Sequence, residues 1–198
     1  MADDGGAAAV PGESAGYIPE DTNTLVLYSG MTSSGEKLSK GDTLQVFSGG
    51  TAILTTVNNG GILQLLDGGL TRSTTVNNGG RFYVYSGGTA DITKINSGGS
   101  INLEGTASNT SVYANGHFNI LSDGTASNTT VFSNGQFHVS YGGAANNTTV
   151  NANASMFITS GGTATGQMNF ANKAVVSAYE GSFFDFDISG VSPKTTCS

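Results

Sequence analysis

Residues 55–61 read TTVNNGG, and residues 74–80 repeat these seven letters without a change. Outward from the two copies, apolar residues recur in two columns at a nearly constant spacing. The first column contains Val57, Val76, Ile95, Val112, Val131, Val150 and Met168. The second column contains Leu27, Val46, Leu65, Val84, Leu103, Ile120, Val139, Ile158 and Val176. A tandem repeat of about 19 residues, present roughly eight times, therefore organises this chain.

Each repeat shows the alternation of apolar and polar residues that is typical of a β-strand. Leu63 and Leu65 flank the polar Gln64, so the two leucines point to one face and the glutamine to the other. Gly-Gly or Asn-Gly pairs follow each half-repeat, where a corner of the chain needs a positive φ. One step is shorter, because two turn residues are missing within residues 103–106.

The repeat favours one path of the chain over another. An antiparallel array would place unlike columns opposite one another, whereas a parallel solenoid stacks each apolar residue on its equivalent in the next coil. We therefore expect an all-β fold, a parallel β-solenoid (β-helix) of about eight coils over residues 23–182, about 40 Å long. Residues 1–22 are rich in Gly, Ala and acidic residues, which predicts a disordered leader. Residues 183–198 are expected to form a C-terminal cap or the truncated start of a following domain.

The composition excludes several classes of protein. Gly, Ser, Thr and Asn make up 95 of the 198 residues, and these are poor helix formers, which excludes a helical bundle. The formal net charge of −7, with scattered basic residues, argues against nucleic-acid binding. No apolar run is long enough for a transmembrane helix, so no membrane insertion of this segment is expected. The first twelve residues lack the basic and apolar regions of a signal peptide, so an export signal would lie elsewhere.

The amino-acid sequence of the repeat resembles that of a known family. Three elements of the repeat, which are the phrase SGGTA, the phrase NTTV at residues 128–131 and 147–150, and the corners Asn-Gly-Gly or Ser-Gly-Gly, resemble the AIDA-type repeat of bacterial autotransporter adhesin passengers. Residues 28–35, YSGMTSSG, look like the first coil of such an array. The resemblance implies a right-handed parallel β-helix in the exported, surface-exposed passenger of a bacterial adhesin. It also implies Ser/Thr glycosylation, because proteins with this repeat are often substrates of heptosyltransferases.

A search for chemistry finds little that the repeat does not explain. His117 and His138 fall at outward positions in different columns, without a third metal ligand beside them. No Asp follows the Gly-Gly pairs in register, so a calcium-binding roll is not expected either. Asp185 and Asp187 point the same way and could hold an adventitious ion, although a solvated cap is the simpler interpretation. We therefore expect neither a metal nor a cofactor.

Many β-helices are polysaccharide lyases or hydrolases, so an enzyme is the alternative hypothesis. Asp91 and Glu104 are the best available pair of carboxylates for glycoside hydrolysis. However, Arg72 precedes Asp91 by one repeat, which predicts a surface ion pair between neighbouring coils. No long loop interrupts the repeat to build a catalytic pocket. A non-enzyme is the expected outcome.

Three further columns bear on function. The column of Thr55, Thr74 and their equivalents could be read as an ice-binding array, but its position two residues before an inward Val predicts that it faces the core or the corner and not solvent. Asn109, Asn128 and Asn147 could form an Asn ladder. The candidate contact surface is an outward stripe of Tyr83, His138, Phe157 and Val175. An adhesive stalk would present this stripe to host cells, sister cells or glycans.

Overall fold

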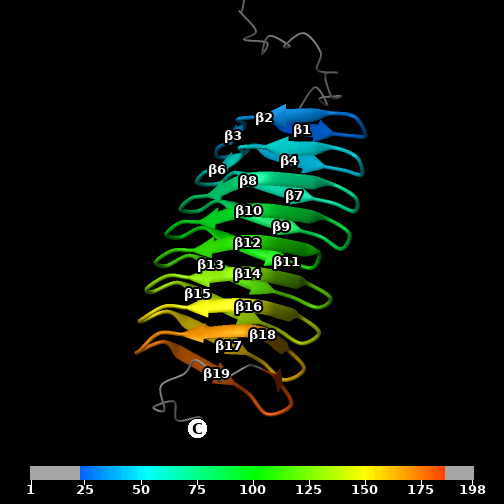
Figure 1. Ribbon diagram of the computed structural model, residues 1–198. Coiled ribbons are helices and arrows are strands. Elements are labelled where there is room, and N and C mark those ends of the chain that lie inside the picture. The colour runs from blue at the N-terminus through cyan, green and yellow to red at the C-terminus, as the bar shows by residue number, and fades with distance from the viewer. Residues whose placement is uncertain (1–22, 186–198) are drawn as a thin grey trace, which may run out of the picture.

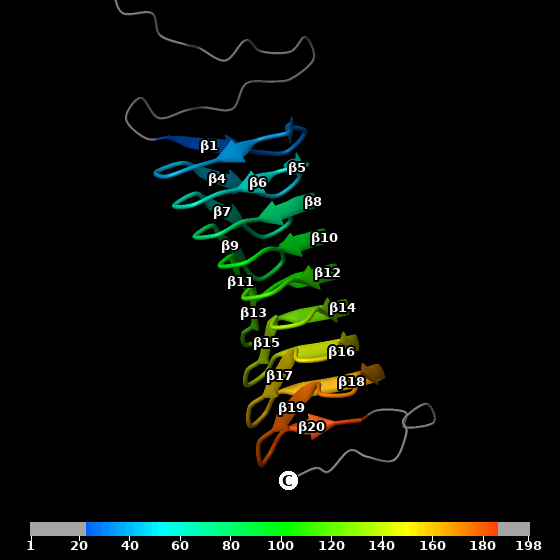
Figure 2. The same cartoon turned by 90° about the vertical axis from the view of Figure 1, so that its left-hand side faces the viewer.

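The computed structural model describes residues 23–185, which form a β-helix built from two parallel sheets. The coils stack into an elongated rod, with β1 at one end and β20 at the other (Figures 1 and 2). The first sheet consists of β1 (Thr24–Leu27), β4 (Thr43–Val46), β7 (Ile62–Leu65), β9 (Arg81–Val84), β11 (Ser100–Leu103), β13 (His117–Ile120), β15 (Gln136–Val139), β17 (Ser155–Ile158) and β19 (Val175–Ala178). The second sheet consists of β2 (Thr32–Ser34), β3 (Lys37–Leu38), β5 (Thr51–Ile53), β6 (Thr56–Val57), β8 (Leu70–Val76), β10 (Thr89–Ile95), β12 (Thr106–Val112), β14 (Thr125–Val131), β16 (Ala144–Val150), β18 (Thr163–Phe170) and β20 (Phe183–Phe184).

The register between coils confirms the predicted parallel solenoid. Every strand pairs in parallel with its equivalent in the next coil, as Leu44 with Leu63 and Leu63 with Phe82. The short step also lies where it was predicted, because Asn119 pairs with Asn102, 17 residues before it, in the first sheet. Within residues 23–185, no helix is long and apolar enough to cross a membrane.

The core lies between the two sheets and is made of the inward columns. Leu63, Leu65 and Val76 are all fully buried, and Phe118 stacks on Phe137 with their ring centroids 5.1 Å apart. Because each inward residue contacts its equivalent above and below, burial of apolar surface is shared along the whole rod.

A column of threonines faces this core, which is one of the two placements that the sequence predicted. Their side chains are at most 1 % exposed, and none of their hydroxyl oxygens has a hydrogen-bond partner in the described part of the chain. The column consists of Thr55, Thr74, Thr93, Thr110, Thr129 and Thr148. These hydroxyls are therefore unavailable to ice or to any other surface partner.

Most corners carry glycine for reasons of space, although Ala154 and Ala174 take the second position of two later corners. A Cβ atom added to Gly69 would lie 2.3 Å from the carbonyl oxygen of Val46 in the preceding coil. Met31 occupies the equivalent position in the first described coil. The Gly-Gly pairs thus allow adjacent coils to approach at strand spacing.

The last coil differs from the prediction. Met168 pairs with Thr148 and Phe170 with Val150, and Val176 pairs with Met156 while Ala178 pairs with Ile158. Met168 and Val176 therefore do not belong to the columns that the sequence assigned to them. The reason is an irregularity between Asn146 and Thr148 that gives β18 one extra residue, so the last step is longer than the period rather than shorter.

The repeat also runs past its expected boundary at residue 182. Phe183 and Phe184 form β20, which pairs in parallel with Thr163 and Ala164 of β18. These two residues are thus part of the second sheet. The predicted leader at residues 1–22 and the remainder of the predicted cap, including Asp187, lie outside the described residues.

Candidate contact surface

The outer face of the first sheet presents two columns of side chains to solvent. The Arg81 column consists of Thr43, Ile62, Arg81, Ser100, His117, Gln136, Ser155 and Val175. The Tyr83 column consists of Gln45, Gln64, Tyr83, Asn102, Asn119, His138, Phe157 and Ser177. Both alternate with the buried columns, because successive side chains of a strand point to opposite faces.

The predicted stripe is partly assembled by the structure. Tyr83, His138 and Phe157 lie in the same column and are half-buried. Val175 does not continue this stripe, because it pairs with Ser155, and Ser177 follows Phe157 instead. The cause is the same lengthened step that displaces Val176, since a step of 20 residues in place of the predicted 18 keeps Val175 on the outer face but moves it to the Arg81 column.

Side chains within the Tyr83 column contact their neighbours along the rod. Gln45 Nε2 donates a hydrogen bond of 2.8 Å to Gln64 Oε1. Asn119 Nδ2 donates one of 2.9 Å to Asn102 Oδ1. The imidazole of His138 stacks on Phe157 with ring centroids 4.9 Å apart. The column is therefore an ordered series of amides and rings rather than a row of independent side chains.

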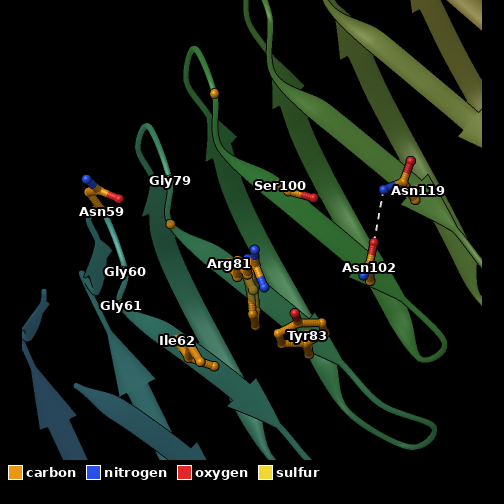
Figure 3. Close-up of a pocket in the computed structure, with 13 residues that line it drawn as sticks. Asn59, Gly60, Gly61, Ile62, Gly79, Arg81, Tyr83, Ser100, Asn102 and Asn119 are labelled. Carbon is orange, nitrogen blue, oxygen red and sulfur yellow. Dashed lines mark hydrogen bonds between the residues drawn. The ribbon is translucent and has the colours of Figure 1, made fainter. Parts of the chain in front are cut away.

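A groove of about 750 Å³ crosses β7, β9, β11 and β13 on this face. The side chains that project into it include Ile62, Arg81, Tyr83, Asn102 and Asn119 (Figure 3). The corners at residues 59–61 and 79–80 form one end of the groove. Arg81 and Tyr83 lie next to one another between these corners and the pair of asparagines (Figure 3).

The charge on this face is opposite to that of the whole chain. The chain has 14 Asp and Glu against 7 Lys and Arg, yet from Thr43 to Ser177 neither the Arg81 column nor the Tyr83 column contains an acidic residue. The same two columns contain Arg81, His117 and His138. Within the described residues, no group of three or more His, Cys, Asp or Glu could hold a metal ion.

The two histidines lie one coil apart in adjacent columns, as predicted from the sequence. His117 pairs with Gln136, whereas His138 pairs with Asn119 and Phe157. Partial burial lowers the pKa of His138 below its usual value of 6.5, and the charge of His117 lowers it further. His138 is therefore neutral near pH 7, and its ring stacks on Phe157 as an uncharged surface.

Asp91, which the enzyme hypothesis pairs with Glu104, is held by three other residues. The predicted ion pair is confirmed, with Arg72 Nε 3.7 Å from Asp91 Oδ2 on the outer face of the second sheet. Ser108 Oγ and Asn109 Nδ2 each donate a 2.9 Å hydrogen bond to Asp91. These bonds, that from Asn109 foremost, lower the pKa of Asp91, so this carboxylate is unsuited to donate a proton at neutral pH.

The amide ladders lie mostly where the sequence did not predict them. Asn128 Nδ2 lies 3.5 Å from Asn109 Oδ1, at the limit of a hydrogen bond, and Asn147 instead accepts one from the Gln167 backbone. The strongest ladder is at a corner, where Asn96 donates to Asn77 at 2.8 Å and Asn77 to Asn58 at 2.9 Å. This corner column continues as Tyr113 and Phe132, whose rings stack 4.8 Å apart.

Sequence reasoning also missed Arg81, Asn102 and Asn119 as parts of one groove. The signal was present in the repeat, since Asn102 follows Tyr83 by one full period and Asn119 follows Asn102 by the shortened one. However, residues so far apart in the sequence become a site only when the first-sheet strand of one coil lies beside that of the next.

The comparisons with known proteins agree with this architecture. Residues 114–169 match the AIDA family model, described as "Adhesin of bacterial autotransporter system, probable stalk". This part of the repeat region is thus similar to the AIDA-type repeat. Its structure is similar to that of a TibA fragment described as hyper-glycosylated in a reaction catalysed by TibC, with a TM-score of 0.70 and 34 % sequence identity. The match covers 85 % of this chain and 58 % of the TibA chain, so this chain spans less than two thirds of that fragment. No curated protein matches the sequence of this chain.

Proposed function

We propose that this chain is a structural and adhesive module, a β-solenoid stalk of an exported bacterial surface protein that mediates cell adhesion or aggregation. The observation that carries the proposal is the AIDA-type repeat, which matches an adhesin stalk family, in an unbroken stack of coils. A rod of eight parallel steps holds a surface away from its point of attachment without needing a second domain.

The contact surface of this module is the outer face of the first sheet. Tyr83, His138 and Phe157 place ring surface in a column that otherwise carries amides. Aromatic residues are enriched at protein interfaces, because they provide large, rigid contact areas. The partner would be a host cell, a sister cell or a glycan.

Display on a non-adherent bacterium tests this function. The chain, fused to a membrane anchor, should increase adherence to cultured epithelial cells or accelerate settling of the bacterial suspension, compared with the anchor alone. Combining Tyr83→Asn, His138→Asn and Phe157→Asn should remove most of this gain, because asparagine already occupies two positions of the same column. Unchanged adherence of this triple variant would exclude the stripe as the contact surface.

A matched control variant lies on another face of the rod. Tyr113 and Phe132 belong to the corner column that also contains Asn58, Asn77 and Asn96. Tyr113→Asn combined with Phe132→Asn therefore removes two stacked rings by the same kind of substitution. Adherence of this control should equal that of the unaltered chain. An anchor-level result for the unaltered chain itself would overturn the adhesive function.

We further infer that outward Ser and Thr side chains are glycosylated, and the description of the TibA fragment as hyper-glycosylated supports this inference. The structure separates hydroxyls that an enzyme could reach from those that it could not. Ser97 and Ser122 are exposed at corners, whereas Thr74 and Thr93 are buried in the core. A glycosyltransferase acting on the folded rod can modify only the first kind.

Co-expression with TibC, followed by peptide mass spectrometry, tests this assignment. Modified residues should lie among the exposed corner hydroxyls, and the peptides containing Thr74 and Thr93 should carry no sugar at these positions. Modification of the buried column would contradict glycosylation of the folded state, and an unmodified protein would overturn the inference altogether.

The role that we propose involves no catalysis. The best carboxylate candidate, Asp91, is ionised and occupied by Arg72, Ser108 and Asn109. A carbohydrate-active enzyme would lose turnover on Asp91→Asn. Incubation of the unaltered chain with a panel of polysaccharides should give no reducing ends, and activity abolished by Asp91→Asn would establish the alternative.

A further inference from the structure

We propose that the groove around Arg81 binds an acidic glycan, with a uronic acid carboxylate on the guanidinium and a sugar ring against Tyr83. This inference rests on the proposed function and deepens it, because it names the chemical class of the partner. It depends on three properties of the groove, which are its free cation, its ring and its unpaired amides.

Arg81 supplies the cation. Its side chain is exposed at the start of β9 and lines the groove (Figure 3). Of the arginines in residues 23–185, Arg72 forms the ion pair with Asp91, whereas Arg81 has no carboxylate within ion-pair distance. A guanidinium binds a carboxylate through two parallel hydrogen bonds, which gives both attraction and orientation.

Tyr83 and the two asparagines supply the contacts to the sugar itself. Tyr83 lies two residues after Arg81 in the same strand and on the same face, with a half-buried ring. The bond from Asn119 to Asn102 uses one amide hydrogen and one amide oxygen, and it leaves Asn102 Nδ2 and Asn119 Oδ1 unpaired within the described residues. One donor and one acceptor in a fixed arrangement suit the hydroxyl groups of a sugar.

Electrostatics select an acidic glycan over a neutral one. A chain with a net charge of −7 repels polyanions in general. The outer face of the first sheet is the exception, because its two columns carry the cation of Arg81 and no acidic residue from Thr43 to Ser177. The acidic residues near this sheet lie at the corners, as Asp67 and Glu104 do.

The length of the groove limits the size of the ligand. It crosses four neighbouring strands, from β7 to β13, which corresponds to three steps of about 4.8 Å each. A short oligosaccharide of three or so rings spans such a distance. A tetrasaccharide is therefore long enough to occupy every subsite.

Binding of defined oligosaccharides to the full chain tests the proposal. Tetragalacturonate, a uronic acid chain, should bind in isothermal titration, and maltotetraose, a neutral chain of equal length, should bind at least tenfold more weakly. Raising the salt concentration should weaken the binding of tetragalacturonate, because part of it is electrostatic. Tripolyphosphate serves as a non-sugar anion and should bind at least tenfold more weakly than tetragalacturonate.

Two arginine variants locate the site. Arg81→Gln should weaken tetragalacturonate binding at least tenfold. Arg72→Gln changes the net charge equally on the opposite sheet and should leave the dissociation constant within twofold. Tyr83→Asn should weaken the binding of the sugar without weakening the residual binding of tripolyphosphate. Circular dichroism of each variant verifies that the β-helix is intact.

Several outcomes would overturn the inference. These are absence of tetragalacturonate binding, equal binding of maltotetraose or tripolyphosphate, and equal effects of the two arginine variants. The adhesion assay keeps this inference distinct from the proposed function. Adherence without tetragalacturonate binding would refute the acidic glycan and leave the adhesin, whereas binding without adherence would do the reverse.

Discussion

Ile92 occupies a position at which an isoleucine is strained. Its φ is 55°, in the left-handed region, and its side chain is 43 % exposed. The next three coils place Asn109, Asn128 and Asn147 at the equivalent position, with nearly the same φ. Asparagine tolerates this conformation, whereas a β-branched residue does so at a cost of about 1–2 kcal/mol.

We expect Ile92→Asn to raise the free energy of unfolding by about 0.5–1 kcal/mol, since it removes this strain and little buried surface. Urea denaturation measures the change. Ile53→Asn is the matched control, because Ile53 is half-buried in a strand without a positive φ, and it should lower stability. A neutral or destabilising Ile92→Asn would contradict the strain argument.

Thr93 fits its buried position in shape, but its hydroxyl group is polar in apolar surroundings. It is 1 % exposed, and its hydroxyl has no partner within the described residues. Thr93→Val keeps the shape and removes the buried hydroxyl, so it should stabilise the protein by about 1 kcal/mol. Thr75→Val, on the outer face of the same sheet, should change stability by less than about 0.5 kcal/mol. Thermal unfolding of both variants tests this prediction. Equal changes in melting temperature would show that desolvation of the Thr93 hydroxyl is not the cause.

His138 makes the stability of the rod depend on pH. Its pKa in the folded protein is lowered below 6.5, mainly by burial and then by His117. The unfolded chain therefore binds the proton more readily than the folded protein does. The contribution of neutral His138 to the free energy of unfolding is complete above pH 6.5 and is lost as the pH falls through the pKa of the folded protein. The pKa of Asp91 is lowered from 3.8, so this carboxylate stays ionised in that range.

The melting temperature should accordingly fall between about pH 7.5 and pH 5.5. His138→Phe, which keeps the stack on Phe157, should reduce this fall. His117→Gln should reduce it by less, because the charge of His117 is the smaller cause. An identical fall in His138→Phe would exclude His138 as its origin.

At the scale of the element, the corner ladder ties three coils together through side chains. Asn77 donates to Asn58 and accepts from Asn96, so it takes part in two hydrogen bonds, while Asn58 takes part in one. Asn77→Ala should therefore lower the free energy of unfolding by about 1–3 kcal/mol, and Asn58→Ala by about half as much. Urea midpoints compare the two variants. Equal losses would show that the ladder does not act through its paired hydrogen bonds.

At the scale of the whole molecule, a deletion tests whether each coil contacts only its neighbours. Deleting residues 61–79 joins Gly60 to Gly80, removes one complete period and places Leu44 against Phe82 in register. The shortened rod should remain folded and β-rich by circular dichroism, with a loss of about one coil interface.

Deleting residues 61–69 instead joins the two halves of a coil out of phase and brings polar positions under apolar ones. This variant should collapse or aggregate. If the full-period deletion unfolds the protein as severely as the half-period one, the stability of the rod is not a sum over neighbouring coils.

The sequence alone determined the period, the parallel stacking, the inward columns and the shortened corner at Glu104. These follow from local causes, because alternation of Leu63, Gln64 and Leu65 sets the faces of a strand, and Gly-Gly pairs set the corners. The buried threonines and the Arg72–Asp91 pair followed from the same arithmetic.

Tertiary packing decided what the period could not. Whether Met168 or Phe170 enters the column of Val150 depends on where β18 accommodates its extra residue, and that shift moved Val175 out of the predicted stripe. The ladder at Asn77 and the groove of Arg81, Tyr83, Asn102 and Asn119 likewise exist only between coils. Contacts between side chains that lie a whole period apart depend on register and rotamer together, and only the stacked coils determine both.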